Sequence, residues 1–208
     1  MVFVAAAFLG FGIALLTVSP PGLLNMTATK INLNAGRMAA FKFVQGALLI
    51  ILIQTGIALV CAKYLYKNQQ IMYMLREIGI GVFALMSAYF LLKKKQKKPK
   101  YLKKKWKPVS VPPLLLGLSL ATLNVLPVPF YVMTSMALSH TGYFKFELGP
   151  MTCFVVGVTV GAGFVFRMYI VMFERMKDQL SWITKRMNLI IGTVLAIAAL
   201  ITAVQLTF

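Results

Sequence analysis

Two proline segments inside long apolar stretches hold the groups of this chain that are best suited to chemistry. The first surrounds Pro20 and Pro21, and the second surrounds Pro127. A proline removes a backbone donor and its ring clashes with the preceding turn, so each segment should interrupt a helix. In a membrane the freed backbone groups need partners. A helix start presents amides to an anion and a helix end presents carbonyls to a cation, so two such breaks can hold a charged molecule without charged side chains.

The two segments correspond to each other in the sequence. With a shift of 107 residues Pro20 falls on Pro127, and Gly10 falls on Gly117. Weaker matches, at a shift of 111, are Gly46 with Gly157 and Gly81 with Gly192. Interrupted segments at corresponding positions of two halves of a chain indicate the binding site of a secondary transporter. Chance similarity is the alternative, because glycine, alanine and leucine match easily between apolar segments.

The prolines also predict where the second half of each broken helix begins. Proline is favoured at the first helical position, so new half-helices should begin at Pro20 and at Pro127. Ser19 is a good N-cap residue directly before the first of them. Asn124 precedes Pro127 by three residues, so it should line the joint.

Other polar residues accompany these breaks. Asn25 follows the first break, and Gln54 lies on the next apolar stretch. Each of these side chains either bonds to a neighbouring helix or contacts a ligand, and the sequence leaves both interpretations open. Arg167 lies within an apolar stretch, where it either snorkels to the membrane surface or pairs with an anionic group. The candidate substrate-binding residues are Ser19, Pro20, Pro21, Gly22, Asn25, Gln54, Asn124, Pro127 and Arg167.

Membrane helices are needed to position these residues. The chain has 208 residues, 60% of them hydrophobic, and a mean hydropathy of +0.82. One crossing of the bilayer core takes about 20 residues. We expect spans at about 2–28, 38–62, 71–92, 114–138, 150–173 and 187–208, the first and fourth of them interrupted. The chain should be a single all-α transmembrane domain (1–208) of six helices, built as two inverted three-helix repeats, 1–92 and 114–208, around a linker at 93–113.

Basic residues set the expected orientation. Of the 22 lysines and arginines, ten lie in one loop between Lys93 and Lys107. Contact with anionic lipid head groups and the topology signal of the loop explain this cluster without nucleic acid. This lysine-rich loop follows the third span, and the loops after the first and fifth spans carry seven of the other twelve basic residues, so all three loops should be cytoplasmic. We therefore expect a multi-pass protein of the cell inner (plasma) membrane with both termini outside.

This orientation can be tested at Gln96, in the lysine-rich loop. In a variant that lacks Cys61 and Cys153, a single cysteine placed at Gln96 should stay unlabelled by a membrane-impermeant maleimide in intact cells, because the loop faces the cytoplasm. Permeabilised cells provide the positive control. Labelling in intact cells would contradict the predicted topology.

Residues for enzyme chemistry are scarce. The four acidic residues have no metal-ligand spacing, and the lone histidine, His140, falls in a short external loop. We therefore expect no enzymatic activity, no metal and no cofactor. Cys61 and Cys153 fall at the outer ends of two spans, where an oxidising exterior could join them. Two free cysteines are the alternative.

Through these segments the chain resembles the LysE/RhtB-type family of amino-acid exporters (the LysE superfamily) over nearly its full length. The run Ser19–Gly22 is similar to the family's Ser-Pro-Gly-Pro motif with the second proline and the glycine exchanged, and Asn124–Pro129 is a looser version of its Asn-Pro motif. The resemblance implies two three-helix repeats and gradient-driven export of amino acids or related small metabolites. Many relatives carry a carboxylate in the fifth span, where this chain has apolar residues and Arg167, which argues against proton coupling and a cationic substrate.

The sequence therefore favours a transporter of small zwitterionic or anionic metabolites, amino acids above all. It is compatible with a homodimer. A non-transporting membrane scaffold or accessory subunit, whose prolines merely bend helices, is the alternative.

Overall fold

The computed structural model describes residues 2–20, 22–68, 111–140 and 142–171, with isolated positions at 71, 81, 84, 85, 87–89, 92, 193 and 196. Within these residues it contains α-helices and short connections, and no strand. The chain divides into two compact units, Met1–Tyr64 with Trp106–Met176 and Leu65–Lys105 with Lys177–Phe208. The first unit holds nearly all of the described residues. Pro21, the lysine-rich loop and most of the predicted spans 71–92 and 187–208 lie outside the described residues.

The first predicted span is interrupted at its prolines. Helix α1 covers Val2–Val18 and helix α2 covers Leu23–Ala35, and the two are bent by 77° relative to each other. α1 ends just before Pro20, because proline cannot continue the hydrogen-bonded ladder. α2 is followed by Gly36, whose φ of 82° is a conformation that glycine adopts without strain.

Two details of this span differ from the prediction. The half-helix does not begin at Pro20 with Ser19 as its N-cap: α2 begins at Leu23, and the N-cap is Gly22. The reason is that Pro20 itself precedes a proline, which disfavours the helical conformation at Pro20. The predicted end at residue 28 is also wrong, because α2 continues to Ala35. No proline or glycine falls between residues 23 and 35, so nothing in the local sequence stops the helix there.

The fourth predicted span is interrupted too. Helix α5 covers Pro113–Leu123 and helix α6 covers Pro127–His140, with a bend of 61° between them. The prediction that a half-helix begins at Pro127 is confirmed. Asn124 lies in the joint as the C-cap of α5, and its amide donates to Ala121 O at 3.1 Å. Both proline segments therefore break a helix, but only the second one also starts the next helix.

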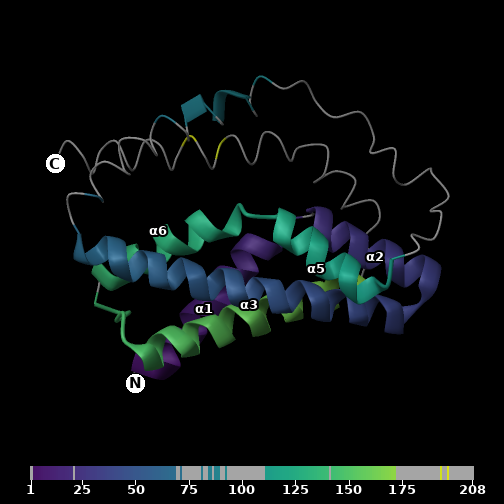
Figure 1. Ribbon diagram of the computed structural model, residues 1–208, viewed down its shortest axis with the longest axis horizontal. Helices are drawn as coiled ribbons and strands as arrows, with labels where there is room; N and C mark the ends of the chain where they lie inside the picture. Colours follow the sequence, from purple (N-terminus) through teal and green to yellow (C-terminus); the bar gives the residue numbers. More distant parts are fainter. Residues whose placement is uncertain are drawn as a thin grey trace. The chain divides into compact units, whose positions relative to one another are not determined.

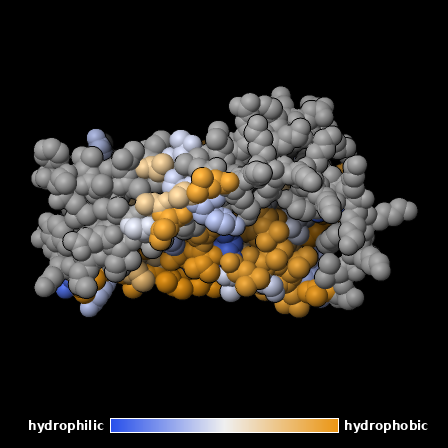
Figure 2. Space-filling model, turned by 90° about the horizontal axis from the view of Figure 1, so that it is seen from above, coloured by the Kyte–Doolittle hydropathy of each residue, from blue (hydrophilic) through white to orange (hydrophobic). Residues whose placement is uncertain are grey.

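Two further helices are continuous. Helix α3 covers Arg37–Lys67, and another helix, the 148–171 helix, covers Leu148–Val171; each is long and apolar enough to cross a membrane. Each bent pair also passes this test as one span, so the described residues contain two to four candidate membrane spans. Large hydrophobic side chains are exposed, and hydrophobic residues cover most of the described surface visible in Figure 2. Such a surface suits lipid rather than water, which is typical of a membrane protein.

Helix α1 packs closely on the 148–171 helix. At Gly10 a methyl group would overlap the carbonyl oxygen of Phe154, and a methyl group at Gly157 would overlap the carbonyl oxygen of Ala7. Small residues let two helix backbones approach in this way inside a membrane, where packing rather than water drives association. The two helices therefore meet through their backbones over about two turns of each helix.

Helix α5 packs on α3 through glycines in the same way. Figure 1 shows the four helices of these two pairs: α1, α3, α5 and the 148–171 helix. A methyl group at Gly117 would overlap the carbonyl oxygen of Phe43, and one at Gly46 would overlap that of Leu114. The shifts of 107 and 111 found in the sequence relate the two contacts residue by residue. The corresponding pairs are Ala7 and Leu114, Gly10 and Gly117, Phe43 and Phe154, and Gly46 and Gly157. The glycines that match in the sequence therefore make equivalent contacts in the two helix pairs.

Candidate functional site

Side chains bond the backbone carbonyls that the first helix break sets free. Asn25 Nδ2 donates to Val18 O at 2.5 Å and to Pro20 O at 3.0 Å. Between them, Ser19 O accepts a hydrogen bond from the Tyr169 hydroxyl at 2.6 Å. A helix end in a membrane would otherwise leave these carbonyls without partners. Asn25 of α2 and Tyr169 of the 148–171 helix therefore stabilise the break.

A side-chain amide does the same at the second break. Gln54 Nε2 of α3 donates to Ala121 O at 3.1 Å and to Asn124 O at 3.3 Å. The predicted site residues Asn25 and Gln54 therefore occupy equivalent places, one at each break. Of the two roles that the sequence left open, bonding to a neighbouring segment is the one that their NH₂ groups fill.

The two breaks lie next to each other. Thr17, in the last turn of α1, and Tyr131, near the start of α6, place their hydroxyl oxygens 3.4 Å apart. Because the Thr17 hydroxyl donates to Ile13 O at 2.9 Å, Tyr131 is left as the donor between them. Tyr131 is buried, and α2 and α5 are also in contact. Residues of the first break therefore touch residues of the second, as a shared site requires.

One buried acceptor at the first break has no donor. Asn25 is 3% exposed. Among the buried side-chain nitrogen and oxygen atoms of the described residues, its Oδ1 is the one without a hydrogen-bond partner. Its orientation is fixed, because Val18 O and Pro20 O can only accept and so must face the NH₂ group. The Tyr169 hydroxyl lies near this side chain, but it donates its proton to Ser19 O. Asn25 Oδ1 is thus a buried acceptor for which the described residues supply no donor.

More backbone donors are available at the start of α2 than at the start of α6. The first backbone hydrogen bond described for α2 runs from Met26 N to Gly22 O at 3.1 Å, so the preceding amides of Leu23, Leu24 and Asn25 have no acceptor within the helix. The start of α6 has fewer backbone amides without an acceptor. Its first and third residues are prolines, and the amide between them, of Val128, donates to Val125 O at 3.1 Å. An anion at the breaks should therefore bind at the start of α2.

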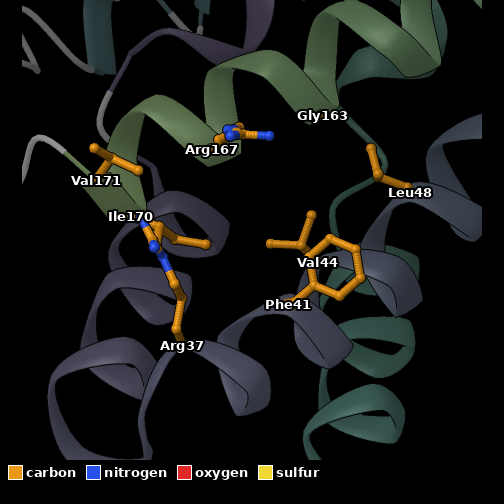
Figure 3. Close-up of a pocket in the computed structure, with 8 residues that line it drawn as sticks. All are labelled: Arg37, Phe41, Val44, Leu48, Gly163, Arg167, Ile170 and Val171. Carbon is orange, nitrogen blue, oxygen red and sulfur yellow. The ribbon is translucent and has the colours of Figure 1, made fainter.

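Arg167 lies apart from the breaks. It is two residues from Tyr169 on the same helix, which places the two side chains about 200° apart around the helix axis. Tyr169 faces the first break, whereas Arg167 lines a cavity of about 440 Å³ together with Arg37 of α3, drawn in Figure 3. Of the predicted site residues, the structure brings Ser19, Pro20, Gly22, Asn25, Gln54, Asn124 and Pro127 to the two breaks, and Arg167 to this cavity.

The sequence-based reasoning missed the two tyrosines at the breaks. Tyr131 and Tyr169 both lie in apolar stretches, and a tyrosine hydroxyl that is buried in such a stretch needs a hydrogen-bond partner. This requirement could have indicated from the sequence that the two tyrosines bond to groups near the breaks. Cys61 and Cys153, whose pairing the sequence left open, are free cysteines in the structure. Among the described residues, no three histidine, cysteine or acidic side chains come together to hold a metal ion.

Comparison with known proteins adds no assignment. No protein-family model, no curated protein and no solved structure matches the chain.

Proposed function

We propose that this protein is a secondary transporter that exports amino acids or related small zwitterionic or anionic metabolites by alternating access. The observation that carries the proposal is the meeting of two interrupted helices, broken at corresponding prolines and joined by the contact between Thr17 and Tyr131. Broken helices that place backbone groups near the middle of a membrane are how transporters bind charged substrates away from water. A scaffold would gain nothing from two breaks that lie next to each other.

The architecture proposed for this function is six helices in two inverted three-helix repeats, as in the LysE/RhtB-type family. The repeated glycine contact supports it, because α1 with the 148–171 helix and α5 with α3 use corresponding residues. In this proposal the odd loops face the cytoplasm, the membrane is the cell inner membrane, and the lysine-rich loop lies on anionic head groups.

The substrate is proposed to bind at the start of α2. Its carboxylate accepts hydrogen bonds from the amides of Leu23 and Leu24, which have no acceptor among the described residues, and the helix dipole there also favours negative charge. Its ammonium donates to Asn25 Oδ1. An α-amino acid carries both groups on one carbon, so acceptor and donors on neighbouring residues of one helical turn suit it. The carbonyl near the end of α1 is the weaker candidate for the ammonium, because Val18 O already accepts from Asn25.

Alternating access is proposed to use the two glycine-packed helix pairs as rigid bodies. Backbones in direct contact cannot slide without breaking that contact, so α1 should move with the 148–171 helix, and α5 with α3. The bond between Thr17 and Tyr131 joins α1 of the first pair to α6, the helix that follows α5, and at 3.4 Å it is long for a hydroxyl pair. Rocking of one pair against the other opens this contact and exposes the start of α2.

Counterflow in proteoliposomes tests the proposed function. Vesicles that contain the purified protein and an unlabelled amino-acid mixture should take up an external labelled amino acid faster than vesicles loaded with buffer only, because exchange is driven by the internal substrate. Protein-free vesicles are the control for leak. A scaffold or accessory subunit gives no counterflow. A well-folded protein that exchanges neither amino acids nor small anionic metabolites would contradict the proposal.

A further inference from the structure

The cavity that Arg37 and Arg167 line is a pocket on the opposite side of the 148–171 helix from the first break. It has a volume of about 440 Å³ and lies between the beginning of α3 and the end of the 148–171 helix. Figure 3 shows Arg37 and Arg167 at its edges, with Phe41, Val44, Leu48 and Ile170 as its walls. The volume falls within the range of about 300–1,000 Å³ that is typical of small-molecule sites.

Among the described residues, the charged groups of this pocket are all positive. The described residues place two guanidinium groups on it and no carboxylate, and neither arginine has a described hydrogen bond or ion pair. Arg37 is also the first residue of α3, so the positive end of a 31-residue helix lies at the same place. Each guanidinium offers five donors in a fixed fork that matches the oxygens of a phosphate or carboxylate. The pocket therefore suits an anion that accepts hydrogen bonds from both guanidinium groups.

The walls require an apolar partner as well. Apart from the arginines, the lining side chains are aliphatic or aromatic. The apolar surface continues outward, since Phe41 is 55% exposed and Val171 is 51% exposed. A small soluble anion would bind the arginines but would leave the apolar side chains of the pocket exposed to water. A molecule with an anionic head and an apolar chain satisfies both parts.

We propose that this Arg37–Arg167 pocket binds one anionic phospholipid. The two guanidiniums hold its phosphate, and an acyl chain follows the wall formed by Phe41, Val44 and Leu48. A basic pocket between membrane helices is the physical form that head-group recognition takes. The site is independent of the proposed transport function, because it lies away from the breaks and binding is measured without transport. It is also distinct from the lysine-rich loop, whose contact with lipid needs no pocket.

Gly163 gives a way to close the pocket without changing its charge. A Cβ atom at Gly163 would meet Leu48 Cδ1 at 3.4 Å, an ordinary contact, so a side chain fits there and extends into the cavity. Leucine is a better helix former than glycine, so Gly163→Leu should fold. Lys42 and Lys63 provide the matched control, because both lie on α3 and neither lines the pocket.

The experiment measures binding of phosphatidylglycerol to the purified full-length protein in detergent by native mass spectrometry, with phosphatidylcholine and inorganic phosphate as competing probes. We expect one tightly bound phosphatidylglycerol whose affinity falls at least tenfold in the Arg37→Gln/Arg167→Gln variant and at least fivefold in Gly163→Leu. The Lys42→Gln/Lys63→Gln variant, with the same loss of charge, should bind within twofold of the parent protein.

Three results would overturn the proposal. Equal losses in both charge variants would mean diffuse attraction to basic residues. Competition by inorganic phosphate at millimolar concentration would mean a site for a soluble anion. Unchanged binding in Gly163→Leu would place the lipid outside this pocket.

Discussion

Replacing Gly117 with alanine is expected to destabilise the protein by about 3 kcal/mol and to lower the midpoint of thermal unfolding by roughly 6–12 °C. The added methyl group would overlap the carbonyl oxygen of Phe43 and lie 3.1 Å from Ala47 N. Both are backbone atoms, so no side chain can turn aside, and α5 must move away from α3. Unfolding of the purified protein in detergent, followed by circular dichroism, measures the change.

The same experiment has three equivalents and two controls within the chain. Gly10→Ala, Gly46→Ala and Gly157→Ala should each cost a similar amount, because each methyl group would also overlap a backbone carbonyl. Gly12 of α1 and Gly56 of α3 have nothing within 4 Å of an added Cβ atom, so alanine there should leave stability unchanged or raise it by about 0.5–1 kcal/mol. Equal effects at both kinds of position would show that the glycines do not set the helix contacts.

The sequence predicted these contacts only in part, and the reason is the range over which each interaction acts. Proline acts on its own turn, so the breaks near Pro20 and Pro127 could be placed from the sequence. The error at the start of α2 was also local, since the effect of Pro21 on Pro20 was left out of the prediction. Glycines matched at two shifts indicated a repeat, but the carbonyls that they touch could be found only in the structure.

The partners of the broken helix ends could not be predicted, because they come from distant parts of the chain. Gln54 reaches a carbonyl 67 residues away and Tyr169 reaches one 150 residues away. Several polar side chains of the apolar stretches could have met these carbonyls, and composition does not rank them. Arg167 is a similar case: its neighbour Arg37 lies in another helix, and only their packing joins them in one pocket.

Replacing Asn25 with leucine is expected to affect both stability and substrate choice. Val18 O and Pro20 O lose their donor, which should cost about 1–3 kcal/mol. The acceptor for the substrate's ammonium is lost as well. A hydrogen bond to a charged group contributes about 1.5–3 kcal/mol, so the preference for an amino acid over the carboxylic acid that lacks its amino group should fall about tenfold or more. Counterflow with the two competing compounds measures this preference.

Gln54→Met is the control that separates the two effects. Gln54 also bonds two carbonyls at a break, so its loss should lower stability by a similar amount. It has no part in the proposed ammonium contact, so the preference for the amino acid should stay within twofold of the parent protein. The comparison therefore removes the effect of a weakened break from the measurement.

Asn25→Asp completes the test, because it keeps an acceptor and removes the donors. Its stability should fall like that of Asn25→Leu, since the carboxylate cannot donate to Val18 O. Its preference for the amino acid should be kept or increased, because a carboxylate attracts an ammonium more strongly than an amide oxygen does. If all three variants lost the preference to the same extent, the loss would follow from the damaged breaks alone. The ammonium would then bind elsewhere, and the start of α2 would not be the substrate site.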